Sequence, residues 1–352
     1  MSQLEQRLAR DLDDIRSSIH RLGIAVHEGL SKAVEALVTG DSRLSYQVIL
    51  GDHPVNREVD ALNLKCHRFI AKHLPSAGHL RFISSSLRII ILIERLGDYA
   101  VTISRESVQM KSTPSGDFKN DLEKMAGDAL TMLHRSLTAY SSQDPELATS
   151  TSKLASSVDR DFLVTLSDLL GQDMDLLTRS EQFARLVIVR QIERVADQAK
   201  NLCEEVVFSS TGKTKQRRRY RLLFLDAEDN AATQIAVALC RKFHADRISS
   251  SSLGKTPAEA ISRDIQNLCE ERGLELSGQD PSGIYSDSEH WRDHDVLITL
   301  NSDIADYCSE LPYGVVPIRW DLPSDAGAEQ VFHFISDKVD DLVHLVRGPS
   351  VD

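Results

Sequence analysis

Two stretches, LRIIILIERLGDYAVTI at residues 87–103 and LVIVRQIERVADQAKNL at residues 186–202, align without a gap at an offset of 99 residues. Both carry the same Ile-Glu-Arg core, followed by an aspartate and then an alanine at the same spacing. A Val-Asp pair recurs at the same offset, at residues 59–60 and 158–159. The chain therefore contains two similar units in tandem.

Each unit has the periodicity of helices. From residue 3 to about residue 208, apolar residues recur every three or four positions, and glycine and proline are sparse. We expect three long helices before about residue 110 and three after it, with Ser42 and Asp144 as helix N-caps near two of the breaks. The predicted fold here is all-α, a pair of three-helix units over residues 1–110 and 111–208.

The shared E-R-x-x-D motif places two carboxylates on one face of a helix, one turn apart. The pairs are Glu94 with Asp98 and Glu193 with Asp197. Like charges at this spacing destabilise an isolated helix by roughly a few tenths of a kcal/mol per pair. A cation held between the carboxylates would reverse the repulsion, and hard cations such as Mg²⁺ or Mn²⁺ prefer oxygen ligands.

Further oxygen ligands come from the preceding helix of each unit. Asp60 and Asp159 occupy equivalent repeat positions there and can face the pairs, while Asp52 and Asn56 form another pair four residues apart. The alternative is an ordinary solvated surface pair, which is common on helices. The recurrence of the motif inside two apolar stretches favours a metal or ligand site.

These motifs resemble the PhoU family. Its members also carry segments similar to AVEALVTGDSRL at residues 33–44, LTAYSSQDPELA at 137–148 and VNREVD at 55–60. The resemblance covers about residues 1–208. PhoU proteins regulate phosphate uptake at the cytoplasmic side of the phosphate ABC transporter and its phosphate-sensing histidine kinase, so the resemblance implies these two partners and a homodimer.

The resemblance also implies metal ligands. Family members bind metal ions at E/D-x-x-x-D motifs, which assigns a divalent or trivalent ion (Mg, Mn or Fe) to the pairs Glu94/Asp98 and Glu193/Asp197. Members often carry an asparagine four positions beyond the motif's aspartate. Asn201 matches this pattern in the second unit, whereas Thr102 replaces it in the first, so the first site is the weaker assignment.

The composition excludes several other roles. The formal net charge of −12 argues against nonspecific nucleic-acid binding, which requires a basic face. The five cysteines are scattered without a CxxC pair, which indicates a reducing compartment. The start of the sequence has no apolar signal region, and the longest apolar run is shorter than the ~20 residues of a membrane-spanning helix. We expect a cytoplasmic protein that meets the membrane only through partners.

A basic linker, SSTGKTKQRR at residues 209–218, separates the helical part from a different domain. It could be a solvated tether, or a patch that contacts anionic lipid or the acidic helices. Residues 219–352 then alternate short apolar strands with helical segments, which predicts an α/β domain with a parallel sheet. Its first strand-to-helix turn follows RLLFLD at residues 221–226, at the sheet edge where such folds bind anions.

From about residue 219 to 346 the sequence resembles the low-molecular-weight phosphotyrosine phosphatase fold, and most closely its thioredoxin-coupled arsenate reductase branch. Those enzymes carry C-x5-R-S-x-M-A-E in this turn. Asp226 stands at the position of the nucleophilic cysteine and Ala232 at that of the anion-binding arginine. Asn301 replaces the first resolving cysteine, Cys308 occupies the second, and Ser324 falls at the general-acid aspartate.

This chemistry predicts a binding module without enzymatic activity. The reaction needs a thiolate stabilised by an arginine and a helix N-terminus, and the acids Asp226, Glu228 and Asp229 would repel an oxyanion. The alternatives are a phosphatase or reductase that uses Cys308 or a carboxylate, a phosphoaspartate receiver, a cation site among the three acids, and a merely solvated loop. A purely structural scaffold is the remaining alternative for the whole chain.

Overall fold

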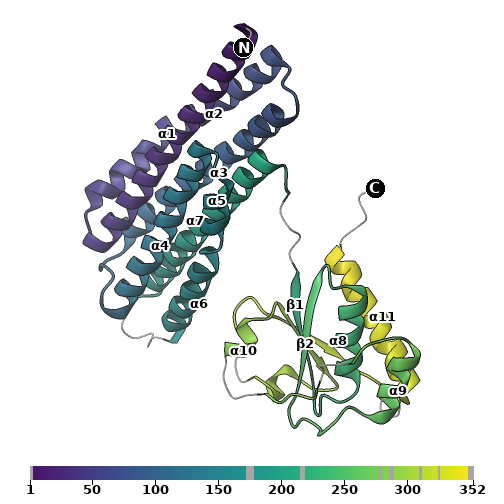
Figure 1. Cartoon of the computed structure of the whole chain (residues 1–352). Coiled ribbons are helices and arrows are strands. Elements are labelled where there is room, and N and C mark those ends of the chain that lie inside the picture. The colour runs from purple at the N-terminus through teal and green to yellow at the C-terminus, as the bar shows by residue number, and fades with distance from the viewer. Residues whose placement is uncertain are drawn as a thin grey trace. The chain divides into compact units, whose positions relative to one another are not determined.

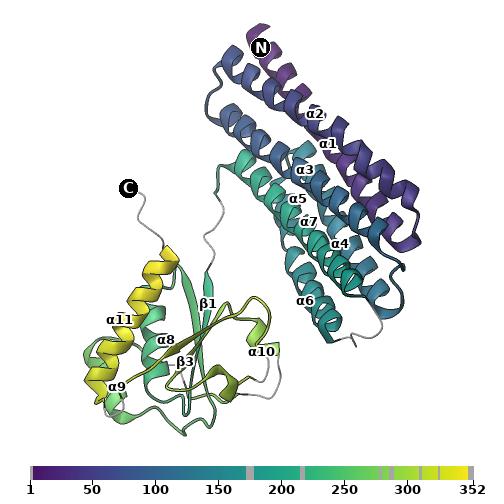
Figure 2. The same ribbon diagram turned by 180° about the vertical axis from the view of Figure 1, so that it is seen from behind.

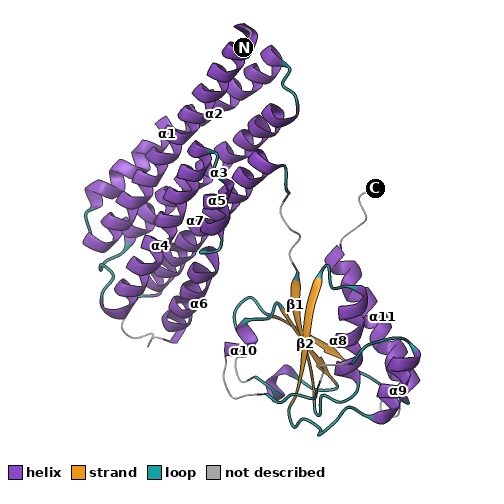
Figure 3. Ribbon diagram, in the orientation of Figure 1, coloured by secondary structure: helices purple, strands orange, loops and turns teal. Residues whose placement is uncertain are grey.

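The computed structural model describes residues 3–171, 178–214, 219–276, 280–284, 289–308, 311–323 and 326–347. The chain divides into two compact units, Met1–Lys215 and Gln216–Asp352. Figure 3 shows that the first is built from helices and the second from helices around a sheet.

The helical unit consists of helices that run side by side, most of them long (Figures 1 and 2). They are α1 (Gln3–Thr39), α2 (Ser42–His73), α3 (Ala77–Gln109), α4 (Gly116–Ser142), α5 (Pro145–Ser152), α6 (Ala155–Gly171) and α7 (Arg179–Thr211). The repeated stretches form α3 and α7, which pack against each other. Their apolar faces belong to a single core shared by both repeats, in which the Ser86 hydroxyl and the Tyr140 hydroxyl are 2.9 Å apart.

The helix boundaries correct two predictions. Asp41, and not Ser42, caps α2, because its carboxylate accepts a hydrogen bond from the Arg43 N–H and Ser42 is already helical. Asp144 caps α5 as predicted. The middle helix of the second repeat is interrupted between α5 and α6, where the Leu154 N–H bonds to the Thr151 carbonyl in a turn tighter than an α-helix. The part of the second repeat that the structure describes therefore has four helices in place of the expected three.

The compact unit Gln216–Asp352, called the α/β unit below, contains a four-stranded parallel sheet in the order β2-β1-β3-β4. Its strands are β1 (Tyr220–Asp226), β2 (Ile248–Gly254), β3 (Val296–Leu300) and β4 (Val316–Trp320), and its helices are α8 (Ala232–Phe243), α9 (Arg263–Glu271), α10 (Glu289–Arg292) and α11 (Ala328–Arg347). Figures 1 and 2 place α8, α9 and α11 on one face of the sheet and α10 on the other. Alternate β1 side chains enter two separate cores, Leu222 and Phe224 on one face and Leu223 and Leu225 on the other.

The sequence pattern predicts helices over residues 256–273 and over residues 302–311 of this unit, and both predictions are too long. The helix expected over residues 256–273 begins only at Arg263, because the Thr256 and Ala258 N–H groups bond to carbonyls of the β1–α8 loop. Of the helix expected over residues 302–311, the described residues contain a three-residue 3₁₀ helix, Ile304–Asp306. Among the described helices, none has an apolar stretch long enough to cross a bilayer.

Candidate functional site

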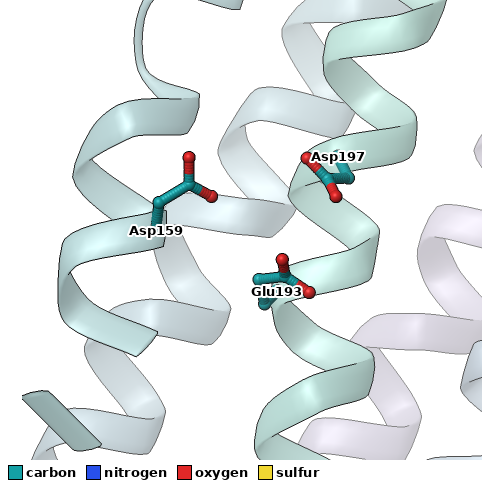
Figure 4. A group of neighbouring side chains, drawn as sticks. All are labelled: Asp159, Glu193 and Asp197. Atoms are coloured by element: carbon teal, nitrogen blue, oxygen red, sulfur yellow. The ribbon is translucent and has the colours of Figure 1, made fainter. Parts of the chain in front are cut away.

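Three carboxylates from the second repeat meet between α6 and α7. Glu193 and Asp197 lie one turn apart on α7, and Asp159 approaches from α6 (Figure 4). One oxygen of each carboxylate lies within 4.8 Å of the others. Apolar residues of α7 such as Ile192 and Val195 are buried in the core, so the helix cannot rotate to carry its acids into solvent.

Glu193 is the buried member of this acidic triad. Its residue exposure is 8%, and burial, reinforced by the charges of Asp197 and Asp159, raises the pKa of its carboxyl to about 7. Arg190 acts in the opposite direction from one turn away, with Nη1 3.2 Å from Glu193 Oε2. That oxygen is buried and accepts no hydrogen bond from the residues that the structure describes. A desolvated oxygen among like charges is a suitable ligand for a hard cation.

The first repeat is arranged differently. Glu94 and Asp98 lie one turn apart on α3, but Asp60 on α2 is exposed, and the described residues of this repeat contain no group of three carboxylates within the same reach. Partial burial and then the charge of Asp52 raise the pKa of Asp98, and Asp52 accepts a hydrogen bond of 2.9 Å from Asn56. The acid that acts on Asp98 therefore comes from a different position of α2 than the repeat indicated.

In the α/β unit, the β1–α8 loop holds its own carboxylate. Asp226 Oδ1 accepts hydrogen bonds from the N–H groups of Glu228, at 3.0 Å, and Asp229, and Oδ2 accepts one of 3.2 Å from the Thr233 hydroxyl. An oxyanion in such a loop would bind these same backbone donors. Burial raises the pKa of Asp226, and its hydrogen bonds oppose that rise.

The interpretation of a solvated loop is wrong for Asp229. This residue is fully buried with φ +52°, and its Oδ2 accepts a hydrogen bond of 2.9 Å from the Ser282 N–H. Burial is the main reason why the pKa of its carboxyl is raised. A side chain at Gly254 would lie 2.8 Å from the Glu228 carbonyl carbon, so this glycine lets the loop pack closely on β2. Asp226, Glu228 and Asp229, all of them described, do not form a group within metal-ligand reach.

Of the remaining positions that correspond to the reductase motifs, Ser324 lies outside the described residues, and Ala232, Asn301 and Cys308 are described. Ala232 is buried as the first residue of α8 and offers no charged group. Asn301 has φ +57°, which asparagine tolerates well, and its Oδ1 accepts a hydrogen bond of 2.6 Å from the Leu322 N–H. Cys308 is buried in the core that covers one face of the sheet.

The helical unit matches a known family. The PhoU domain model matches residues 19–107 and again residues 122–206. The phosphate-specific transport system accessory protein PhoU of Escherichia coli (strain K12) is 30% identical over 203 residues, which cover 57% of this chain and 84% of that protein. The chain belongs to the PhoU family. The crystal structure of the phosphate transport system regulatory protein PhoU from Streptococcus pneumoniae superimposes with a TM-score of 0.56 at 28% identity, over 59% of this chain and 99% of that chain.

The α/β unit bears a more distant likeness to arsenate reductases. A solved structure described as an arsenate reductase in the phosphate binding state is 18% identical, with a TM-score of 0.31, and the match covers 36% of this chain and 98% of that chain.

The two PhoU matches include both acidic motifs, Glu94/Asp98 in the first and Glu193/Asp197 in the second. This family member therefore joins a PhoU-type helical unit to a parallel-sheet unit.

Proposed function

We propose that this PhoU family member regulates phosphate uptake, and that a divalent or trivalent metal ion bound by Asp159, Glu193 and Asp197 organises its helical unit for contact with partners. The single observation that carries the metal site is the triad itself, in which one oxygen from each of three carboxylates lies within 4.8 Å of the others and Glu193 is buried. Three oxygen donors suit Mg²⁺, Mn²⁺ or an iron ion, and water would complete the coordination.

The partners in the proposal are the phosphate ABC transporter and the phosphate-sensing histidine kinase. Support comes from the relatives, which are named as accessory proteins of the phosphate-specific transport system. A homodimer is part of the same proposal. Light scattering of the purified chain tests the dimer, and co-purification with each tagged membrane partner tests the contacts. A monomer that co-purifies with neither partner would contradict this part of the proposal.

Metal analysis of the purified full chain tests the site. We expect one tightly held ion at the triad, lost in the double variant Glu193→Gln plus Asp197→Asn. The matched control is Glu94→Gln plus Asp98→Asn at the equivalent repeat positions, which leaves the triad ion in place. Equal metal content in the triad variant and the wild type would refute the metal site and leave the purely structural scaffold as the better account.

We further propose that the α/β unit is a binding module without phosphatase or reductase activity. Asp226 already bonds to the loop donors that an oxyanion would need, and Ala232 supplies no clamping cation. The purified full chain should turn over neither para-nitrophenyl phosphate nor arsenate. If the chain turned over either substrate, and if Asp226→Ala or Cys308→Ser abolished that turnover, the α/β unit would be a phosphatase or reductase and the proposal would be overturned.

A further inference from the structure

A hollow lies in the helical unit, away from the acidic triad. Its volume is about 840 Å³, and it is bordered by the N-terminal half of α1, the first turns of α3 and the last residues of α7. Ser210 at its edge is 17 positions beyond Glu193 on α7, or about 25 Å along the helix axis. A ligand in this hollow would therefore not touch the triad.

The hollow contains an arginine without a counter-charge. Arg81, in the first turns of α3, makes no ion pair within the part of the chain that the structure describes, and its Nε is buried without a hydrogen-bond partner. A partly desolvated guanidinium normally has an acidic partner, because leaving it unpaired costs free energy. The missing partner of Arg81 is the main sign that something else binds there.

Two other residues of the lining also hold a buried donor that lacks a hydrogen-bond partner. Among the described residues, neither Arg16 Nε nor the Ser210 hydroxyl oxygen, both of them buried, has a hydrogen-bond partner, although Arg16 Nη1 bonds to Asp13 at 3.1 Å. His79 adds a ring that can also donate. Arginine Nε can only donate, so the shared requirement of these groups is for acceptor oxygens.

We propose that this hollow is an oxyanion site that takes a phosphate group, with Arg81 as its principal ligand and Arg16 and Ser210 as further donors. The acids of the lining, Glu5 and Asp13, are exposed at its rim, and Asp13 is already paired with Arg16. The volume exceeds that of a bare phosphate ion and lies in the range of small-molecule pockets. The group could come from inorganic phosphate or from a phosphorylated small molecule, and the probes below distinguish them.

Isothermal titration calorimetry of the full chain at low, constant ionic strength tests the site. The probes are inorganic phosphate, AMP and adenosine, and sodium chloride is added to keep the ionic strength equal in all titrations. We expect binding of phosphate or AMP and none of adenosine. Binding of AMP that is tighter than that of phosphate identifies a phosphorylated small molecule as the ligand, and the reverse order identifies the free ion.

Arg81→Gln should weaken this binding by roughly 10- to 100-fold, the usual effect of losing a charged hydrogen bond. Ser210→Ala should weaken it less. The control Arg43→Gln removes an exposed arginine that is paired with Asp41 outside the hollow, and should change nothing. Circular dichroism and melting of each variant confirm that it is folded.

The triad variant Glu193→Gln plus Asp197→Asn should retain the binding, which separates this inference from the metal site. Three outcomes would overturn it: no heat with either phosphate or AMP, equal affinity in a folded Arg81→Gln chain, or loss of the binding in the triad variant. The last result would place the phosphate on a metal ion.

Discussion

The raised pKa of Glu193 predicts that the triad destabilises the metal-free protein at alkaline pH. An ordinary glutamate titrates near 4.5, whereas the folded protein holds the pKa of Glu193 at about 7. The folded state therefore binds this proton more tightly than the unfolded state does. The stabilising contribution is complete below pH ~4.5 and is lost as the pH rises through ~7.

The magnitude follows from the shift of the pKa. A difference of about 2.5 units at about 1.36 kcal/mol per unit gives about 3 kcal/mol by pH 8, as an upper bound. Glu193→Gln removes the ionisation and should make the metal-free helical unit more stable than the wild type at pH 8 by up to this amount. The two should be nearly equal at pH 4.5. At roughly 2–4 °C per kcal/mol for a unit of this size, the rise in melting temperature is roughly 6–12 °C at most.

The measurement is thermal melting followed by circular dichroism at 222 nm, in chelator, across pH 4.5 to 8. The control Glu94→Gln removes the equivalent carboxylate of the first repeat, which lies outside any described group of three acids, and should gain less stability at pH 8. Adding Mn²⁺ at pH 8 should then stabilise the wild type and not Glu193→Gln. The reasoning would be refuted if the two variants showed the same difference from the wild type at every pH.

Three further outcomes are expected. The affinity of the triad for Mn²⁺ should fall by up to tenfold for each pH unit below about 7, because the metal competes with the Glu193 proton, and a titration that shows no pH dependence would contradict this. Asp226→Ala should lower the free energy of unfolding of the α/β unit by roughly 1–3 kcal/mol, because two loop N–H groups lose their acceptor. An unchanged midpoint in denaturant unfolding would contradict the role of the Asp226 carboxylate as the acceptor of the loop. Gly254→Ala should lower the free energy of unfolding of the α/β unit by roughly 1–3 kcal/mol, because the added methyl group would clash with the β1–α8 loop. Gly327→Ala serves as the control, since a methyl group there meets nothing within 4 Å.

Local pattern was enough for the class of each unit and for the carboxylate pairs. Helical periodicity and the 99-residue repeat depend only on neighbours along the chain, so Glu193 and Asp197 could be placed on one face of a helix without coordinates. The same holds for the parallel sheet and for the position of Asp226 at the end of its first strand. These features are set by side-chain spacing, which the sequence records directly.

Burial and contacts between segments were decided only by the tertiary structure. The repeat makes Asp60 and Asp159 equivalent, yet Asp159 joins a carboxylate group and Asp60 is exposed. The acidic loop looked solvated because charge in a sequence says nothing about what covers it, whereas the close packing at Gly254 buries Asp229. The pKa of Glu193 and the unpaired Arg81 belong to this second kind of property, because desolvation and the lack of a partner arise from surfaces that the folded chain brings together.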